Sequence, residues 1–241
     1  MTGVGDILMS LMDGVREHAG LPELLCRDAC DKLGVDGAGV ALMDSAGTIE
    51  RVVGSDERTI ELETLQLSLG EGPCVEAFGS GRLVMLGDLA GEGAHRFPIY
   101  TPAAREMGIA AMFSYPLHIG AIRLGVLDLF SERAGLLPDE TFALALDYVD
   151  VAILILLHLQ SLDAAAHYRG NGADHDGSSQ HAFDVAFISH PEVHQATGMV
   201  SVQAAVGLRE ALLMLRARAF ASGRHLHEVA RDVVDRKVTF P

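Results

Sequence analysis

Basic side chains are concentrated near the end of an acidic chain, where they could bind a polyanion. The 241-residue sequence has 18 Lys and Arg against 33 Asp and Glu, a formal net charge of −15. From residue 186 to 241, however, seven basic residues stand against five acidic ones. Guanidinium groups contact phosphate and stack on bases, so this local excess predicts nucleic-acid binding confined to the segment. The candidate contacts are Arg209, Arg216, Arg218, Arg231, Arg236 and Lys237.

Cysteines and histidines are the other side chains that could carry chemistry. Cys74 follows a Gly-Pro turn at an expected helix start, where the amide dipole can lower a thiol pKa, but a small buried side chain is the favoured interpretation. Cys26 and Cys30 are one helical turn apart, and without a second pair they are expected in the core. His95 and His118 are isolated, and lone histidines are seldom ligands. We therefore expect no metal site, and the sequence leaves any cofactor unknown.

Neither catalysis nor secretion has support in the sequence. No Ser-His-Asp order, phosphate loop or paired-carboxylate pattern is evident, so we expect a protein that is not an enzyme. Three cysteines do not make a disulfide framework, which favours a reducing cytoplasm. The N-terminus has Asp6 and no basic region before an apolar run, and the longest fully apolar run, 151–157, is too short for a membrane span. These features predict a cytoplasmic protein without a membrane partner.

Apolar residues at helical spacing predict three short amphipathic helices over 193–204, 208–219 and 226–233. Gly207 separates the first two, and Gly223 can end the second in the left-handed conformation. Connections this short predict an all-α three-helix bundle. Its expected core is rich in small side chains, and Gly198, inside the first helix, is expected at a close helix contact.

This bundle resembles an ANTAR domain, the RNA-binding output module of bacterial transcription antitermination regulators. The resemblance covers most of residues 187–240. It implies binding to stem-loops of a nascent transcript, and one departure from the family is Thr197, where many members carry Lys. Thr197 is therefore added to the candidate RNA contacts. The matching features are Ala196 with Gly198, Glu210 with Ala211, Leu215 with Arg216 and then Ala219, and Val229 with Ala230.

Two other interpretations of the bundle stay open. It can be a packing or dimerisation module with solvated arginines, or a DNA-binding helix-turn-helix. Against the second, basic residues of the third helix are interspersed with Glu228, Asp232 and Asp235, a poor match for duplex phosphates. RNA loops need fewer charges when bases stack, and Phe220 and Phe240 offer rings for this, although Phe220 could equally be core.

The preceding residues predict one α+β domain with an antiparallel sheet and flanking helices. Short strands with tight turns exclude a doubly wound parallel fold. The expected helices are 5–19, 21–33 and about 138–162, and the expected strands are 39–43, 48–53, 83–87, 111–118 and 122–130.

This order resembles a GAF domain, a sensory module that binds a small molecule or mediates dimerisation. The most distinctive segments are Leu69–Cys74, Gly81–Met85 and Gly87–Leu89. The resemblance names neither the ligand nor whether the signal activates or inhibits. Some GAF-fold proteins are thiol reductases, but such chemistry at Cys74 would need resolving cysteines in the same loop region, which are not there.

The domains are expected at 5–162 for the GAF-like sensor, 163–182 for a linker and 183–241 for the ANTAR-like bundle. Residues 148–159 are apolar around nearly the whole helix, which predicts a homodimer through this helix and the N-terminal one. Residues 183–188 can form a short helix or an extended segment that docks the bundle. The chain is thus predicted to be a cytoplasmic, homodimeric, signal-responsive antitermination regulator. The alternatives are a DNA-binding regulator and a GAF signalling protein that binds no nucleic acid.

Overall fold

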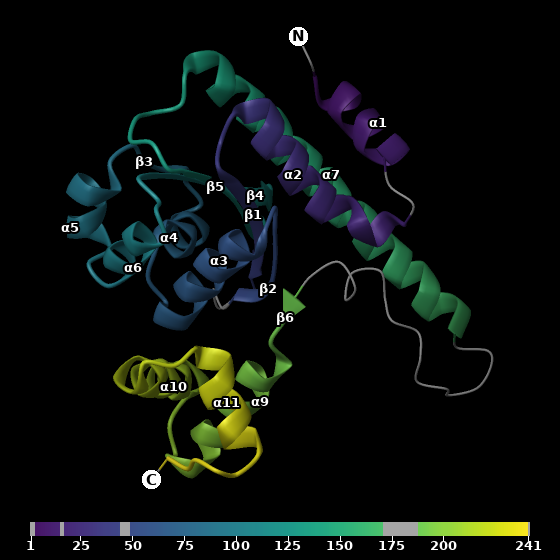
Figure 1. Ribbon diagram of the computed structural model, residues 1–241. Helices are drawn as coiled ribbons and strands as arrows, with labels where there is room; N and C mark the ends of the chain where they lie inside the picture. The colour runs from purple at the N-terminus through teal and green to yellow at the C-terminus, as the bar shows by residue number, and fades with distance from the viewer. Residues whose placement is uncertain (1–2, 15–16, 44–48, 171–187, 241) are drawn as a thin grey trace.

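The centre of the molecule is a six-stranded antiparallel sheet (Figure 1). The computed structural model describes residues 3–14, 17–43, 49–170 and 188–240. The strand order is β3-β4-β5-β1-β2-β6, and every predicted strand is present within a few residues. The turn expected at 44–47 lies outside the described residues. The strands are β1 (Gly37–Met43), β2 (Ile49–Gly54), β3 (Val84–Leu86), β4 (Ala111–Ile119), β5 (Ile122–Ser131) and β6 (Ile188–Ser189).

Two helices, α2 (Leu21–Leu33) and α7 (Asp139–Gly170), cover one face of the sheet, and α1 (Val4–Gly14) packs on their outer side. α2 has Pro22 in its first turn. Gly34 follows its last residue with a φ of 65°, the left-handed conformation that commonly ends a helix. The first predicted helix, 5–19, ends earlier, at Gly14. α7 ends later than predicted and enters the expected linker, of which 171–182 lie outside the described residues.

α7 combines a buried side with exposed apolar residues. Tyr148, Val151 and Ile155 are buried against the sheet, whereas Leu154 and Leu157 are exposed. Its portion Asp139–Leu162 is long and apolar enough to cross a membrane by length and composition, although the core helix of a domain passes the same test. The packing of one side on the sheet accounts for part of this apolar character.

The opposite face is covered by α3 (Glu57–Leu69), α4 (Pro73–Ser80) and α6 (Tyr100–Glu106), with a π-helical turn, η2 (Leu89–Gly93), and a short turn, α5 (Ala94–Arg96). α3 was not predicted, because polar residues are mixed with the apolar ones on its buried side. Its N-terminus is capped by Asp56, whose carboxylate accepts a hydrogen bond from the Thr59 amide at 2.7 Å. α4 begins at Pro73, the helix start expected from the sequence.

The C-terminal residues form the predicted three helices, α9 (Pro191–Gln203), α10 (Leu208–Ser222) and α11 (Leu226–Val234). Gly223 has φ 62° and ends α10 as expected. Val193, Leu215 and Val229 are buried in the bundle core, but Leu208, also predicted there, is 63% exposed. The all-α bundle was therefore predicted correctly, with an error at the start of its second helix.

The bundle is joined to the sheet domain by strand pairing and by packing. β6 pairs with β2, with Ile188 opposite Val52, so the end of the expected docking segment is extended; residues 183–187 lie outside the described residues. The bundle core and the core on the α3 side form one continuous hydrophobic cluster. α10 and α11 both contact α3, which makes α3 the surface on which the bundle rests.

The position of Gly198 in α9 contradicts the expected close helix contact. A Cβ atom built there would meet no atom within 4 Å. We therefore expect Gly198→Ala to raise the free energy of unfolding by about 0.5–1 kcal/mol, because alanine loses less backbone entropy in a helix. Thermal melting of the full chain measures the change, and a loss of stability would indicate a crowded contact after all.

Candidate functional site

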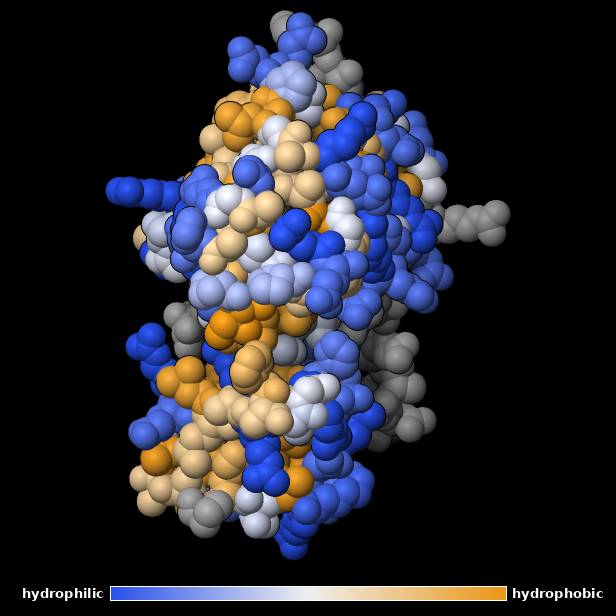
Figure 2. Space-filling model, turned by 60° about the vertical axis from the view of Figure 1, so that its left-hand side comes forward, coloured by the Kyte–Doolittle hydropathy of each residue, from blue (hydrophilic) through white to orange (hydrophobic). Residues whose placement is uncertain are grey.

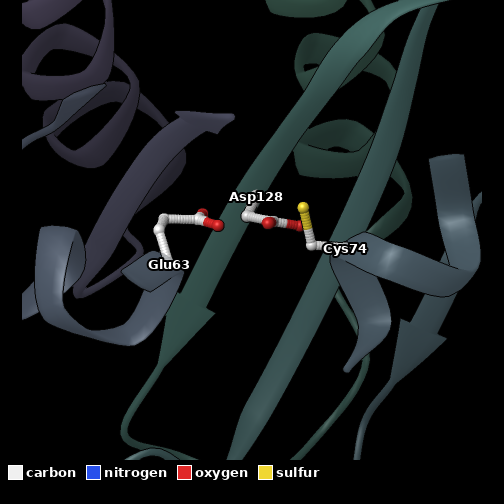
Figure 3. Close-up of side chains that lie close together, drawn as sticks. All are labelled: Glu63, Cys74 and Asp128. Atoms are coloured by element: carbon white, nitrogen blue, oxygen red, sulfur yellow. The ribbon is translucent and has the colours of Figure 1, made fainter. Parts of the chain in front are cut away.

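A buried polar cluster lies between the sheet and the helices α3 and α4 (Figure 3). It is formed by Glu63 of α3, Cys74 of α4 and Asp128 of β5, all three without solvent exposure. One ligand atom from each, a carboxylate oxygen or the thiol sulfur, lies within 4.8 Å of the other two. Figure 3 shows the Asp128 side chain between the other two. Charged groups are rarely buried without compensation, so this cluster is the first candidate site.

Gln66 forms hydrogen bonds with all three residues of the cluster. Its Nε2 donates to Glu63 Oε2 at 3.3 Å and to Asp128 Oδ2 at 3.4 Å. Its Oε1 accepts a hydrogen bond from the Cys74 amide at 2.9 Å. Gly72, at φ 148°, permits this approach, because a Cβ there would lie 2.3 Å from Gln66 Oε1. The Gly-Glu-Gly-Pro-Cys segment therefore fixes the Cys74 backbone against α3.

Small residues of the sheet leave room for the two carboxylates. A Cβ on Gly39 of β1 would lie 2.8 Å from Glu63 Oε1. Ser114 of β4 is the register partner of Asp128 and is also fully buried. Three buried oxygens, Glu63 Oε1, Asp128 Oδ1 and Ser114 Oγ, make no hydrogen bond within the described part of the chain. The cluster thus has unused acceptor and donor capacity directed into the core.

Burial governs the charge state of the cluster. It raises the pKa of Glu63 well above its usual value, and the neighbouring Asp128 charge raises it further. Burial likewise raises the pKa of Asp128, and it raises the pKa of the Cys74 thiol with help from both carboxylates. The activated, low-pKa thiol that a helix start could produce is therefore not found at Cys74. The protein groups themselves favour protonated forms.

In chelator-treated protein, Glu63→Gln should stabilise the fold more at pH 8 than at pH 5. The unfolded Glu63 side chain loses its proton near pH 4.3, whereas the folded side chain keeps its proton to a higher pH. The free energy of unfolding therefore falls as pH rises from about 4.3 towards the folded pKa. Glutamine removes this loss, so its gain in Tm over the wild type should be larger at pH 8 than at pH 5. Thermal melts at both pH values test this, and equal shifts would contradict it.

A second candidate is the pocket between the sheet domain and the bundle. Its volume is about 290 Å³. From the sheet domain it is lined by Leu65, Leu69 and Ile99, and from the bundle by Phe220 and Arg224. Figure 2 shows hydrophobic side chains gathered at this junction and over the bundle below it. The pocket is therefore a feature of the docking contact.

Arg216, a predicted RNA contact, lies in that docking contact instead of on a free surface. Its Nε donates to the Leu67 carbonyl oxygen at 3.2 Å, at the C-terminal end of α3. A Cβ on Gly70 would lie 2.5 Å from its guanidinium, which shows how closely the group packs there. A cation is favoured at a helix C-terminus, and burial lowers the pKa of Arg216. Nearby, the Leu226 amide donates to Ser68 Oγ at 3.3 Å.

In the part of the chain that the structure describes, the remaining predicted RNA contacts include both unpaired cations and cations held in ion pairs. Arg209, Arg218 and Arg236 are exposed and make no ion pair among the described residues. Arg231 Nη2 lies 3.8 Å from Glu192, and Lys237 Nζ lies 2.8 Å from Asp235.

Thr197 and the two aromatic rings have different environments. The Thr197 hydroxyl donates to the Val193 carbonyl at 2.6 Å within α9, so it is engaged in its own helix. Phe220 is 66% exposed and is available for stacking, whereas Phe240 is buried, with the Arg218 guanidinium 5.9 Å from its ring centroid. Of the two rings considered in the sequence, only Phe220 is accessible.

The minor candidates from the sequence lie apart from the cluster. His95 and His118 are exposed. Cys26 is buried in the core between α2 and the other sheet face, as expected, and Cys30 packs beside it. Glu63, Gln66 and Asp128 were not predicted from the sequence. Asp128 could have been recognised as a candidate, because an acidic residue inside an apolar strand is unusual.

Comparison with known proteins concerns the sheet domain. A family model described as GAF domain matches residues 20–150. No curated protein matches the chain. Similar solved structures include the GAF domain of an Acinetobacter phosphoenolpyruvate-protein phosphotransferase, which is 11% identical, with 66% of this chain and 93% of that chain covered and a TM-score of 0.48.

Two further similar structures are each 18% identical. One is a domain of a putative two-component sensor histidine kinase protein from Sinorhizobium meliloti, with 64% and 96% of the two chains covered and a TM-score of 0.46. The other is free methionine-R-sulfoxide reductase from Neisseria meningitidis, with 63% and 84% covered and a TM-score of 0.43. The family match ends before the bundle begins. Because the matched residues 20–150 are more than half of the sequence, the chain belongs to the GAF domain family.

Proposed function

We propose that this protein is a cytoplasmic, signal-responsive regulator in which the GAF domain controls RNA binding by the C-terminal bundle. By its resemblance to ANTAR domains, the bundle would hold stem-loops of a nascent transcript and promote antitermination. The observation that carries the proposal is the charge distribution. The bundle segment has seven basic and five acidic residues, whereas the rest of the chain has 11 and 28. A strongly acidic chain repels nucleic acid, so an excess of basic residues in one segment is expected if that segment binds a polyanion.

Docking on α3 supports control of the bundle by the GAF domain. The guanidinium of Arg216 and the ring of Phe220 both face the GAF domain, the first at Leu67 and the second in the 290 Å³ pocket. In the docked arrangement the half-buried guanidinium of Arg216 is not fully available to RNA, whereas the Phe220 ring remains largely exposed. A signal that loosens the contact with α3 would expose this cation next to a stacking surface that is already accessible.

Arg209→Ala in the full chain is expected to weaken RNA binding about tenfold, which corresponds to about 1.4 kcal/mol. Loss of one phosphate contact should also reduce the salt slope of single-stranded binding by about 0.7. Arg82→Ala is the matched control, since Arg82 is an exposed arginine of the GAF domain, outside both the bundle and the pocket. Binding to an RNA library with a duplex-DNA control measures both. Unchanged affinity and slope in Arg209→Ala would remove this residue from the interface.

Leu65→Arg tests the control by docking. Leu65 lines the pocket with Arg224 and His225, so a new cation there should repel the bundle and raise RNA affinity several-fold. Glu61→Arg is the control, because Glu61 is exposed on the same helix and lies outside the pocket. This control changes the net charge by +2, whereas Leu65→Arg changes it by +1, so charge alone would favour the control. In the Leu65→Arg background, Arg216→Ala should weaken binding again. Equal affinity of Leu65→Arg and Glu61→Arg would contradict masking.

The other proposed features follow from surfaces of the GAF domain. Exposed apolar side chains on α1 and α7 favour a homodimer, in which they would be covered: Met9, Met12, Leu146, Leu154 and Leu157. We retain the interpretation that the protein is not an enzyme, because the Cys74 thiol has a raised pKa and the other two cysteines pack on the opposite face of the sheet. Clear preference for duplex DNA would favour a helix-turn-helix regulator instead.

A further inference from the structure

We propose that Glu63, Cys74 and Asp128 bind one divalent transition-metal ion, of the Zn²⁺ type, in the core of the GAF domain. This site is independent of RNA binding. Three side chains from three separate elements converge with their ligand atoms within 4.8 Å of one another. A thiolate and two carboxylates suit a borderline divalent ion, which accepts both sulfur and oxygen ligands.

The charge of the cluster provides the first argument for a cation. Two carboxylates and a thiol share a site without exposure, and no Lys or Arg forms an ion pair with them within the described ranges. Gln66 gives each carboxylate only one neutral amide contact, at 3.3 and 3.4 Å. Without an ion, burial favours the protonated forms of these groups, and a divalent ion would balance the charge of the ionised donor set far better than an amide can.

The unpartnered oxygens provide a second, independent argument. Ser114 Oγ is fully buried, lies on the strand beside Asp128 and has no hydrogen-bond partner in the described structure. Glu63 Oε1 and Asp128 Oδ1 are also unpartnered. Buried polar atoms normally find partners, so an arrangement with three open oxygens is costly unless something occupies the space between them. Ser114 is suitably placed to support or complete the coordination of the ion.

The supporting residues have the arrangement expected around a metal site. Zinc ligands lie about 2.0–2.3 Å from the ion, and three donor atoms within 4.8 Å of one another are near enough to share one ion after side-chain adjustment. Gln66 fixes both the Cys74 backbone and the carboxylates, as outer residues commonly do for ligands. Metal binding would displace protons from Cys74 and the carboxylates and thereby couple the site to pH.

The test uses the full chain, treated with a chelator and then titrated with Co²⁺, which reports thiolate ligation through an intense near-ultraviolet charge-transfer band. We expect one Co²⁺ per chain, displacement by Zn²⁺ and a higher Tm with either ion. Cys74→Ser should abolish the band and lower Co²⁺ affinity by at least about tenfold. Cys30→Ser is the matched control, because Cys30 packs on the other side of the sheet and should leave band and affinity unchanged.

Two results would overturn the proposal. It fails if the wild-type chain binds no Co²⁺, or if folded Cys74→Ser keeps the charge-transfer band. If Cys74→Ser does not fold by circular dichroism, Glu63→Gln decides. This near-isosteric change should remain folded and lose at least about tenfold in Co²⁺ affinity and most of the metal-dependent rise in Tm. Wild-type affinity in folded Glu63→Gln would overturn the site as described.

Discussion

Ile155→Glu is expected to unfold the GAF domain, whereas the adjacent change Leu154→Glu should leave it folded. Ile155 is 1% exposed and packs between α7 and the sheet, so a glutamate there would be buried without a partner. We expect a loss of about 4 kcal/mol, large relative to the stability of a typical domain. Circular dichroism and thermal melting measure the difference. A folded Ile155→Glu protein with the wild-type Tm would contradict the packing of α7.

The matched change tests the dimer proposal. Leu154 is 43% exposed on the other side of α7, so a glutamate there remains solvated in a monomer. Its stability should change by less than about 0.5 kcal/mol, but it should dissociate a dimer formed through this helix. Light scattering gives the mass. A monomeric wild type would contradict the dimer, and a Leu154→Glu dimer would exclude this face of α7 from the interface.

Gly125→Ala is expected to lower the Tm by about 6–12 °C. Gly125 lies in β5 opposite Leu42 of β1, and a Cβ there would be 2.1 Å from the Ala41 carbonyl oxygen. The central strands would have to separate locally, at a cost of about 3 kcal/mol, which for a chain of this size gives the stated shift.

Gly79→Ala is the control for Gly125→Ala. Gly79 lies within α4, and a Cβ there would meet no atom within 4 Å. This change should be neutral or stabilising by up to about 1 kcal/mol. Equal melting temperatures for the two variants would show that the β1–β5 contact tolerates a side chain.

Glycine positions show where sequence reasoning fails. Gly198 was expected at a crowded contact because small residues surround it in sequence, yet its Cβ direction is open. Gly125 attracted no attention, yet its Cβ direction is blocked by the carbonyl group of another strand. Gly223 was predicted correctly, because helix termination is a local backbone property. Local conformational requirements can be read from sequence, whereas the atom that faces a glycine depends on strand register and helix packing.

The antiparallel sheet, its long flanking helices and the three-helix bundle were predictable from the sequence alone. These elements follow from apolar periodicity and turn residues, which act over a few neighbouring positions. The sequence alone did not predict α3, because the buried side of this helix includes Glu63 and Gln66 and so lacks an apolar stripe.

Which polar groups meet depends on the packing of elements that are distant in sequence. Asp128 is far in sequence from Glu63 and Cys74, and the three come together because α3 and α4 cover the β5 face of the sheet. Arg216 likewise looks like a surface cation on its own helix, and it is half-buried only because α10 rests on the end of α3. Such contacts arise from the packing of whole elements, whose relative positions no local pattern encodes.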